Sequence, residues 1–333
     1  MRTALVTSLP AVSSHTHLHS ASKESRFTQA RQNFTQWMEL EEWTQSQSDQ
    51  NDAKNRYSGP GNHPVHPYDH SLVTLASGTY VNASKIPSVW GYNICTQAPL
   101  PPSFDEFWQM LIEEGISTVI VLTDIVAQRT IKMHCYWPSE SYPILDYPDK
   151  SIRVSYIRNS TWRGIERTIV NVGRTEPLTI YHIRSWKDHQ APDQETLERI
   201  EALLIHLLKD AKTPQPPFAV HCSSGTGRAG AFLLAYNLLQ MAQERLLDQR
   251  MLDDETLENV TSRTFPNDCQ RTTFRRALNE IEEPYRSAVR ELLPLMRSAR
   301  PNLVEARQLL PAVTLAQKIA RERLLTQEDR TAS

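Results

Sequence analysis

The chain has 333 residues, 39% hydrophobic and 22% charged, and its 36 basic and 38 acidic residues give a net charge of −2. This composition is typical of a globular protein that buries a sizeable core. Balanced charge argues against nucleic acid as a partner, and no apolar run is long enough to predict a membrane span. The four cysteines are far apart and show no zinc-ligand spacing.

The first fifty residues precede the recognisable motifs. Residues 1–26 are rich in Ser, Thr and His without periodicity, which predicts a flexible tail. They do not resemble a secretory signal peptide, although their low hydrophobicity is compatible with the export signal of a bacterial effector. Apolar residues at helical spacing predict a helix over residues 27–45, and residues 46–52 lack apolar side chains and indicate a linker.

Alternating helix and strand patterns fill the middle of the chain. An apolar face predicts a helix over residues 103–114, which Gly115 ends, and residues 118–123 predict a buried strand. Alternation between residues 150 and 183 predicts a series of β-hairpins. Residues 194–209 predict another helix, with Asp193 at its N-cap.

Residues 186–192, Trp-Lys-Asp-His-Gln-Ala-Pro, form a loop that contains one carboxylate, Asp188. A carboxylic acid on such a loop can protonate a leaving group and can close over a bound substrate. The alternative is that Asp188 is an ordinary turn residue.

The most informative stretch is Val220–Gly230, Val-His-Cys-Ser-Ser-Gly-Thr-Gly-Arg-Ala-Gly. It connects a short predicted strand, residues 218–220, to a predicted helix from about Ala229 to Leu239. Five residues between Cys222 and Arg228 bring several backbone N–H groups together at a helix N-terminus, where they can bind a tetrahedral oxyanion. These five residues are Ser223, Ser224, Gly225, Thr226 and Gly227.

Arg228 can add two parallel hydrogen bonds to such an anion, and Cys222 beside these dipoles is expected to be a thiolate. A thiolate directed at a bound phosphate is a nucleophile for phosphoryl transfer. The alternative is an ordinary buried cysteine in a tight turn. The stretch lacks the Gly-Lys-Ser/Thr ending of a nucleotide-binding loop, which disfavours nucleotide binding.

The remaining chain is predicted to be mostly helical. A helix is expected over residues 253–260 and a turn over residues 264–268, followed by a loop that contains Gln270. Residues 284–333 predict a helical C-terminal extension, punctuated by prolines, that packs on the core.

The motif His221-Cys222, five residues, Arg228 resembles the tyrosine-specific protein phosphatases. The resemblance extends from about residue 54 to residue 277, through several motifs in the family's order: Lys54-Asn55-Arg56-Tyr57, Tyr80-Val81-Asn82-Ala83-Ser84 and Trp186-Lys187-Asp188. It implies an α/β domain over residues 27–283, with a central, twisted, mixed β-sheet flanked by α-helices.

The resemblance also implies a role for each site residue. Cys222 is the nucleophile, Arg228 and residues 223–227 bind the phosphate, and Asp188 is the general acid. Gln270 is expected to orient the hydrolytic water, and Tyr57 to stack on the substrate ring. The supporting residues are His221, Trp186 and Lys132. No metal or cofactor is expected, and the expected partners are phosphotyrosine proteins or peptides.

Three positions depart from the family's pattern. Lys187 replaces a proline of the acid-bearing loop, Ala229 replaces a Ser or Thr, and Gly59 lies where an acidic residue is common. The first two favour a slow enzyme. One alternative is a pseudophosphatase that binds phosphotyrosine without turnover, and another is a phosphoinositide or dual-specificity phosphatase. We expect a monomer in a reducing cytosol, either of the cell that makes it or of a host.

Overall fold

A computed structural model describes residues 28, 31–32, 65–208, 216–265 and 267–324 of the chain. The predicted tail, the linker, Tyr57 and nearly all of the helix predicted over residues 27–45 lie outside the described residues.

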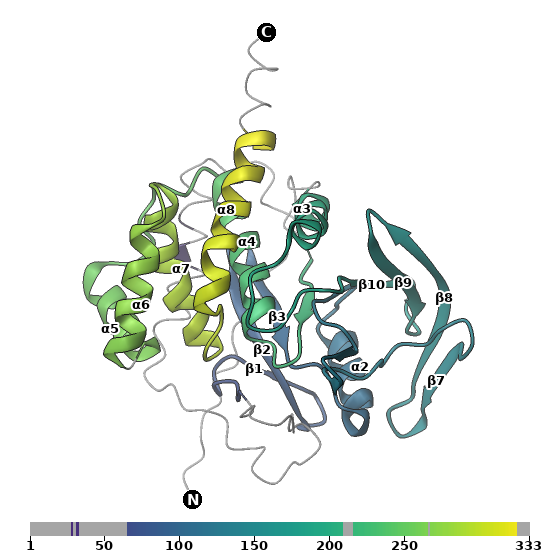
Figure 1. Ribbon diagram of the computed structural model, residues 1–333. Coiled ribbons are helices and arrows are strands. Elements are labelled where there is room, and N and C mark those ends of the chain that lie inside the picture. The colour runs from purple at the N-terminus through teal and green to yellow at the C-terminus, as the bar shows by residue number, and fades with distance from the viewer. Residues whose placement is uncertain (1–27, 29–30, 33–64, 209–215, 266, 325–333) are drawn as a thin grey trace, which may run out of the picture.

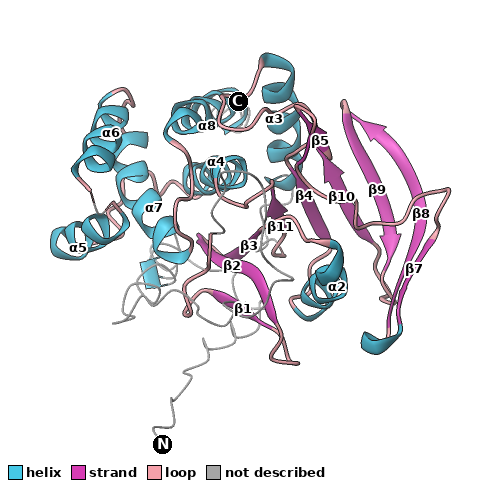
Figure 2. Cartoon of the chain, turned by 60° about the horizontal axis from the view of Figure 1, so that its bottom comes forward, coloured by secondary structure: helices cyan, strands magenta, loops and turns pink. Residues whose placement is uncertain are grey.

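A nine-stranded mixed sheet forms the centre of the molecule (Figure 1). Its strand order is β1-β2-β3-β11-β4-β10-β9-β8-β7 (Figure 2). Its strands are β1 (Leu72–Thr74), β2 (Tyr80–Ser88), β3 (Gly91–Thr96), β4 (Thr118–Val121), β7 (Ile144–Tyr147), β8 (Ile152–Trp162), β9 (Ile165–Asn171), β10 (Leu178–His182) and β11 (Ala219–His221). The four central strands β3, β11, β4 and β10 are parallel, and the outer pairs are antiparallel. The predicted mixed α/β architecture is confirmed.

Helices cover both faces of this sheet (Figure 2). They are α2 (Phe104–Glu113), α3 (Gln194–Leu208), α4 (Gly227–Gln243), α5 (Asp254–Thr264), α6 (Asp268–Asn279), α7 (Tyr285–Ala299) and α8 (Ala306–Ile319). One core lies under α2, and a larger core contains α3, α4, α7 and α8. A small second sheet pairs β5 (Val126–Ala127) with β6 (Thr130–Ile131).

Helix α4 is the centre of the larger core, because its residues are buried without a break from Gly227 to Met241. Most of its side chains are apolar, since the sheet covers one side of the helix and α7 and α8 cover others (Figure 2). A helix that is apolar all round is one that is buried all round. The described helices α7 and α8 therefore pack in the same core as α4.

Local sequence signals place most of these elements. Helix α3 begins where predicted, because the Asp193 carboxylate accepts a hydrogen bond of 2.9 Å from the Thr196 N–H. The prediction of a loop at Gln270 was wrong. Gln270 lies in the first turn of α6, whose N-cap is Asn267: its side chain accepts a 2.9 Å hydrogen bond from the Gln270 N–H.

Candidate active site

The loop of residues 222–226 leaves the carboxyl end of β11, in the middle of the parallel strands, and enters α4 at Gly227. Ligands of open α/β sheets bind at this edge. Cys222 is buried and 2% exposed. The site therefore lies at the carboxyl edge of the parallel strands, beside the N-terminus of α4.

This loop, called the phosphate loop below because the sequence predicts that it binds phosphate, requires glycine at position 225. Gly225 has φ +68°, and a Cβ at this position would overlap the carbonyl oxygen of Thr96 at the end of the neighbouring strand β3. Just beyond the end of β3, the Ala98 N–H donates a 3.0 Å hydrogen bond to the Ser223 carbonyl. The loop is thus fixed against the strand beside it.

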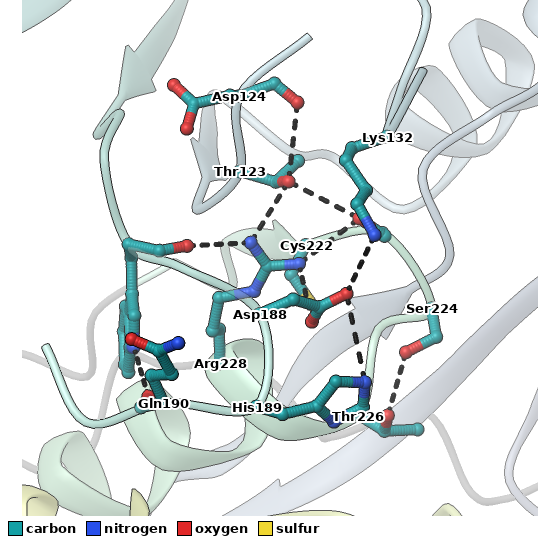
Figure 3. Close-up of polar contacts among 12 residues, drawn as sticks. Thr123, Asp124, Lys132, Asp188, His189, Gln190, Cys222, Ser224, Thr226 and Arg228 are labelled. Atoms are coloured by element: carbon teal, nitrogen blue, oxygen red, sulfur yellow. Dashed lines mark hydrogen bonds and ion pairs between the residues drawn. The ribbon is translucent and has the colours of Figure 1, made fainter. Parts of the chain in front are cut away.

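Four acceptors surround the buried guanidinium of Arg228. It donates to Thr123 Oγ1 at 3.1 Å, the Trp186 carbonyl at 2.9 Å, Asp188 Oδ1 at 3.0 Å and Ser223 Oγ at 3.1 Å (Figure 3). Only 3% of its side chain is exposed. The arginine thereby connects its own loop to the loop that contains Asp188.

Asp188 lies among cations. Its Oδ2 atom is 3.3 Å from Lys132 Nζ and 4.0 Å from His189 Nε2. The carboxylate lies between Arg228 and Lys132 (Figure 3). Burial alone would raise the pKa of this carboxyl, but the charges of Arg228, His189 and Lys132 together hold the pKa below its ordinary value. The group is a carboxylate in this arrangement.

His221 is fully buried between two hydrogen-bonding partners. Its Nε2 is 2.9 Å from the Tyr136 hydroxyl and its Nδ1 is 2.9 Å from the Cys222 carbonyl. Burial lowers the pKa of this imidazole to about 4, although the bond to the Cys222 carbonyl opposes the shift. The ring is therefore neutral near pH 7, and it orients the start of the loop without adding a charge.

Most of the sequence-predicted site residues lie together. Ser224 Oγ and Thr226 Oγ1 are 2.8 Å apart, and the Trp186 indole donates to the Gln190 carbonyl at 3.0 Å within the acid-bearing loop. Gln270 lies on α6 and lines a neighbouring cavity of about 580 Å³ that His189 also lines. No contact joins Gln270 to the phosphate loop within the described residues, and its role with water stays a prediction.

Three residues of the site were missed by the sequence analysis. Thr123 follows β4, the strand beside β11, so its place at a strand end was a usable signal. Glu305, before α8, lies against Gly227. Arg300 follows α7 and lies behind the phosphate loop. It donates to the Gly225 carbonyl at 2.7 Å and the Ser224 carbonyl at 3.0 Å. Neither Glu305 nor Arg300 carries a recognisable sequence signal.

The described residues offer neither a metal site nor a membrane-spanning helix. No group of three or more His, Cys, Asp or Glu side chains among them could hold a metal ion. None of their helices combines the length and apolar character needed to cross a membrane.

Much of the chain is similar in sequence to known proteins. The profile of the family described as "Protein-tyrosine phosphatase" matches residues 51–256. The chain belongs to this family. Among its relatives is the human receptor-type tyrosine-protein phosphatase eta, 35% identical over 213 residues, which are 60% of this chain and 15% of that protein. A Lar-like tyrosine-protein phosphatase of Caenorhabditis elegans is 34% identical over 221 residues, which are 60% of this chain and 9% of that protein. The chain thus matches only a small part of these relatives.

Proposed function

We propose that this protein is an active protein tyrosine phosphatase that works through a cysteinyl-phosphate intermediate. One observation supports this most strongly: Cys222 and Arg228 bracket one anion-binding loop, and the Asp188 carboxylate from another loop lies 3.0 Å from the Arg228 guanidinium. A nucleophile, an oxyanion-binding group and an acid are thereby brought together, as acyl- and phosphoryl-transfer sites require.

In the first step, the Cys222 thiolate attacks the phosphorus atom of phosphotyrosine. The S–P bond forms as the bond from phosphorus to the phenolic oxygen breaks, and that oxygen takes the proton of the Asp188 carboxyl. Arg228 and the N–H groups of the loop stabilise the phosphoryl oxygens. In the second step, water attacks phosphorus, the thiolate leaves, and Asp188 accepts the proton of the water. We keep Gln270 as a proposed aid in orienting that water.

Substrate binding can itself prepare the acid. A phosphate dianion in the loop competes with Asp188 for the Arg228 guanidinium, whose hydrogen bonds are otherwise taken by protein acceptors. Its negative charge also offsets the cations that lower the pKa of Asp188. We therefore propose that the bound phosphate raises this pKa and favours the protonated carboxyl that the first step needs.

Two replacements favour slow turnover. Ala229 is fully buried at the start of α4, where the family's hydroxyl would stabilise the departing thiolate. Lys187 is exposed on the acid-bearing loop and lacks the rigidity of proline. We propose that breakdown of the phosphoenzyme limits the rate.

Phosphotyrosine proteins or peptides are the proposed substrates, since the resemblance implies that Tyr57 stacks on the substrate ring. We also propose that the protein is a monomer. A reducing compartment is proposed because Cys222 must stay a free thiol. Export into a host cell stays a prediction without further support.

A burst experiment tests the proposal. An aryl phosphate is mixed with wild type, Cys222→Ser and Asp188→Ala, and phenol release is followed from the first turnover. We expect a burst followed by slow turnover in wild type and neither in Cys222→Ser. Binding of a phosphotyrosine peptide without burst or turnover would indicate the pseudophosphatase instead. Comparable hydrolysis of phosphoserine peptides or phosphoinositides would contradict tyrosine specificity.

A further inference from the structure

The acid-bearing loop contacts the N-terminal end of α8 through the residue that follows Asp188. His189 Nδ1 is 2.9 Å from Glu305 Oε2, and the other ring nitrogen, Nε2, is 4.0 Å from Asp188 Oδ2. The imidazole therefore lies between the proposed general acid and a carboxylate that belongs to a separate element.

Glu305 also contacts the phosphate loop. A Cβ at Gly227 would lie 2.7 Å from Glu305 Oε1, so the carboxylate packs directly against that glycine. One turn later, Gln308 is 1% exposed, and its amide donates a 3.4 Å hydrogen bond to the Gln190 carbonyl. The start of α8 thus contacts both loops on which the chemistry depends.

The backbone that presents Glu305 is firmly held. The Val304 N–H donates to the Thr226 carbonyl at 3.2 Å, and Arg297 donates to the carbonyls of Leu303 at 2.8 Å and Val304 at 2.9 Å. Val304 has φ +60°, a conformation that a β-branched residue adopts only when its surroundings impose it. Glu305 is therefore presented from a fixed position.

We propose that Glu305 is a positioning residue for the general acid, and that the His189–Glu305 pair holds the loop of residues 186–192 closed while phosphate occupies the site. This inference rests on the proposed function. Arg228 holds the loop through the Trp186 carbonyl and Asp188, and a bound phosphate competes for that guanidinium. The His189–Glu305 pair uses no phosphate-binding group, so it persists when the Arg228 contacts are lost.

The size of the effect follows from exposure. The His189 side chain is 65% exposed and that of Glu305 30%, so the pair is worth little more than a surface ion pair. Its loss should slow proton donation by roughly two- to fivefold. The value of kcat/KM reports it, because this parameter covers the steps up to leaving-group departure and excludes phosphoenzyme breakdown.

The test compares two leaving groups. Phenyl phosphate needs the acid more than p-nitrophenyl phosphate, because phenolate is the more basic leaving group. We expect Glu305→Gln and His189→Asn each to lower kcat/KM for phenyl phosphate by roughly two- to fivefold, with a smaller loss for the nitrophenyl ester. Asparagine suits position 189, where φ is +57°. The double variant should lose no more than one single variant.

Glu201→Gln is the matched control. It breaks the 2.7 Å ion pair between Glu201 of α3 and Lys318, which lies at the other end of α8. It should leave both substrates unaffected. Losses that multiply in the double variant, or that are equal for the two leaving groups, would overturn the proposal.

Hydrogen exchange separates this proposal from the proposed function. In the presence of inorganic phosphate, the backbone amides of residues 186–191 should exchange faster in Glu305→Gln and His189→Asn than in wild type and Glu201→Gln. If wild type hydrolyses neither ester, the proposed function fails, and this measurement alone decides whether the pair holds the loop. Equal exchange in all four proteins would reject the pair.

Discussion

The guanidinium of Arg300 is fully buried behind the phosphate loop, where it also donates to Asn82 Oδ1 at 2.8 Å. Because it binds loop carbonyls from behind, it leaves the N–H groups free to face the anion. Arg300→Met removes the guanidinium that donates to the Ser224 and Gly225 carbonyls, and it leaves Gly225 with only the weak donor of the Cys95 thiol at 3.2 Å. We expect the free energy of unfolding to fall by roughly 3 kcal/mol and hydrolysis to be lost. Urea denaturation measures the free energy of unfolding, and an aryl phosphate assay measures hydrolysis.

Two further variants make this prediction specific. Arg300→Lys keeps the charge but not the planar fork, so it should recover only part of the stability. Arg250→Met removes an exposed arginine that pairs with Asp254 on the surface, and its melting temperature should match wild type. Full activity in Arg300→Met would contradict the role of this residue.

His221 makes stability depend on pH. Its folded-state pKa of about 4 lies below the ordinary value of 6.5, so the unfolded chain binds the proton more readily. The stabilisation is complete above pH 6.5 and is lost as the pH falls toward 4, by roughly 3 kcal/mol. Urea denaturation between pH 7 and pH 4.5 should show a steeper decline for wild type than for His221→Gln. Parallel curves would mean that His221 titrates normally.

Ala229→Ser restores a hydroxyl at the start of α4. If this hydroxyl donates to the departing thiolate, one hydrogen bond of about 1 kcal/mol should speed phosphoenzyme breakdown by roughly fivefold. The steady rate after the burst should rise while the rate of the burst itself stays the same. An unchanged steady rate would show that another step limits turnover.

At the scale of elements, α4 and the turn after α7 are in close contact at Gly230. A Cβ there would lie 2.5 Å from the Val304 N atom and 3.0 Å from Leu303 Cδ2. Gly230→Ala should therefore destabilise the fold by roughly 2 kcal/mol. In an unhindered helix the same change would stabilise the fold by up to about 1 kcal/mol. The sign of the measured change in unfolding free energy therefore decides whether the contact at Gly230 is as close as described.

Elements with a strong local pattern could be predicted from the sequence. The apolar face of α2, the N-cap of α3 and the strand-loop-helix of β11 and α4 each depend on neighbouring residues. Helix α6 was missed at Gln270, because its N-cap, Asn267, follows a proline within a polar stretch that also reads as a turn.

Contacts between distant segments could not be predicted in this way. The motif identified Cys222, Arg228 and Asp188, but nothing near Arg300 or Glu305 in the sequence indicates a site. These two residues reach the phosphate loop only because α7 and α8 pack on α4. That packing is a property of the folded chain.

At the scale of the molecule, the predicted boundary after residue 283 divides a continuous core. Val289, Leu292 and Met296 of α7 and Val313 of α8 belong to the same cluster as α4. A chain ending at Glu283 would expose the buried surface of α4 and lack Arg300. We expect it to show no cooperative unfolding and no hydrolysis. Cooperative unfolding with activity in the truncated chain would show that residues 27–283 form a complete domain.

The order of strands has a consequence for how the chain is made. Strands β3 and β4 do not pair with each other; the three-residue strand β11 lies between them and joins β1-β2-β3 to β4-β10-β9-β8-β7. During translation, both parts of the sheet are synthesised before Ala219. Until β11 follows, β3 and β4 are therefore unpaired edge strands of the two parts. Such edges promote aggregation. We therefore expect nascent chains of this protein to be prone to aggregation until the strand that leads to Cys222 has emerged.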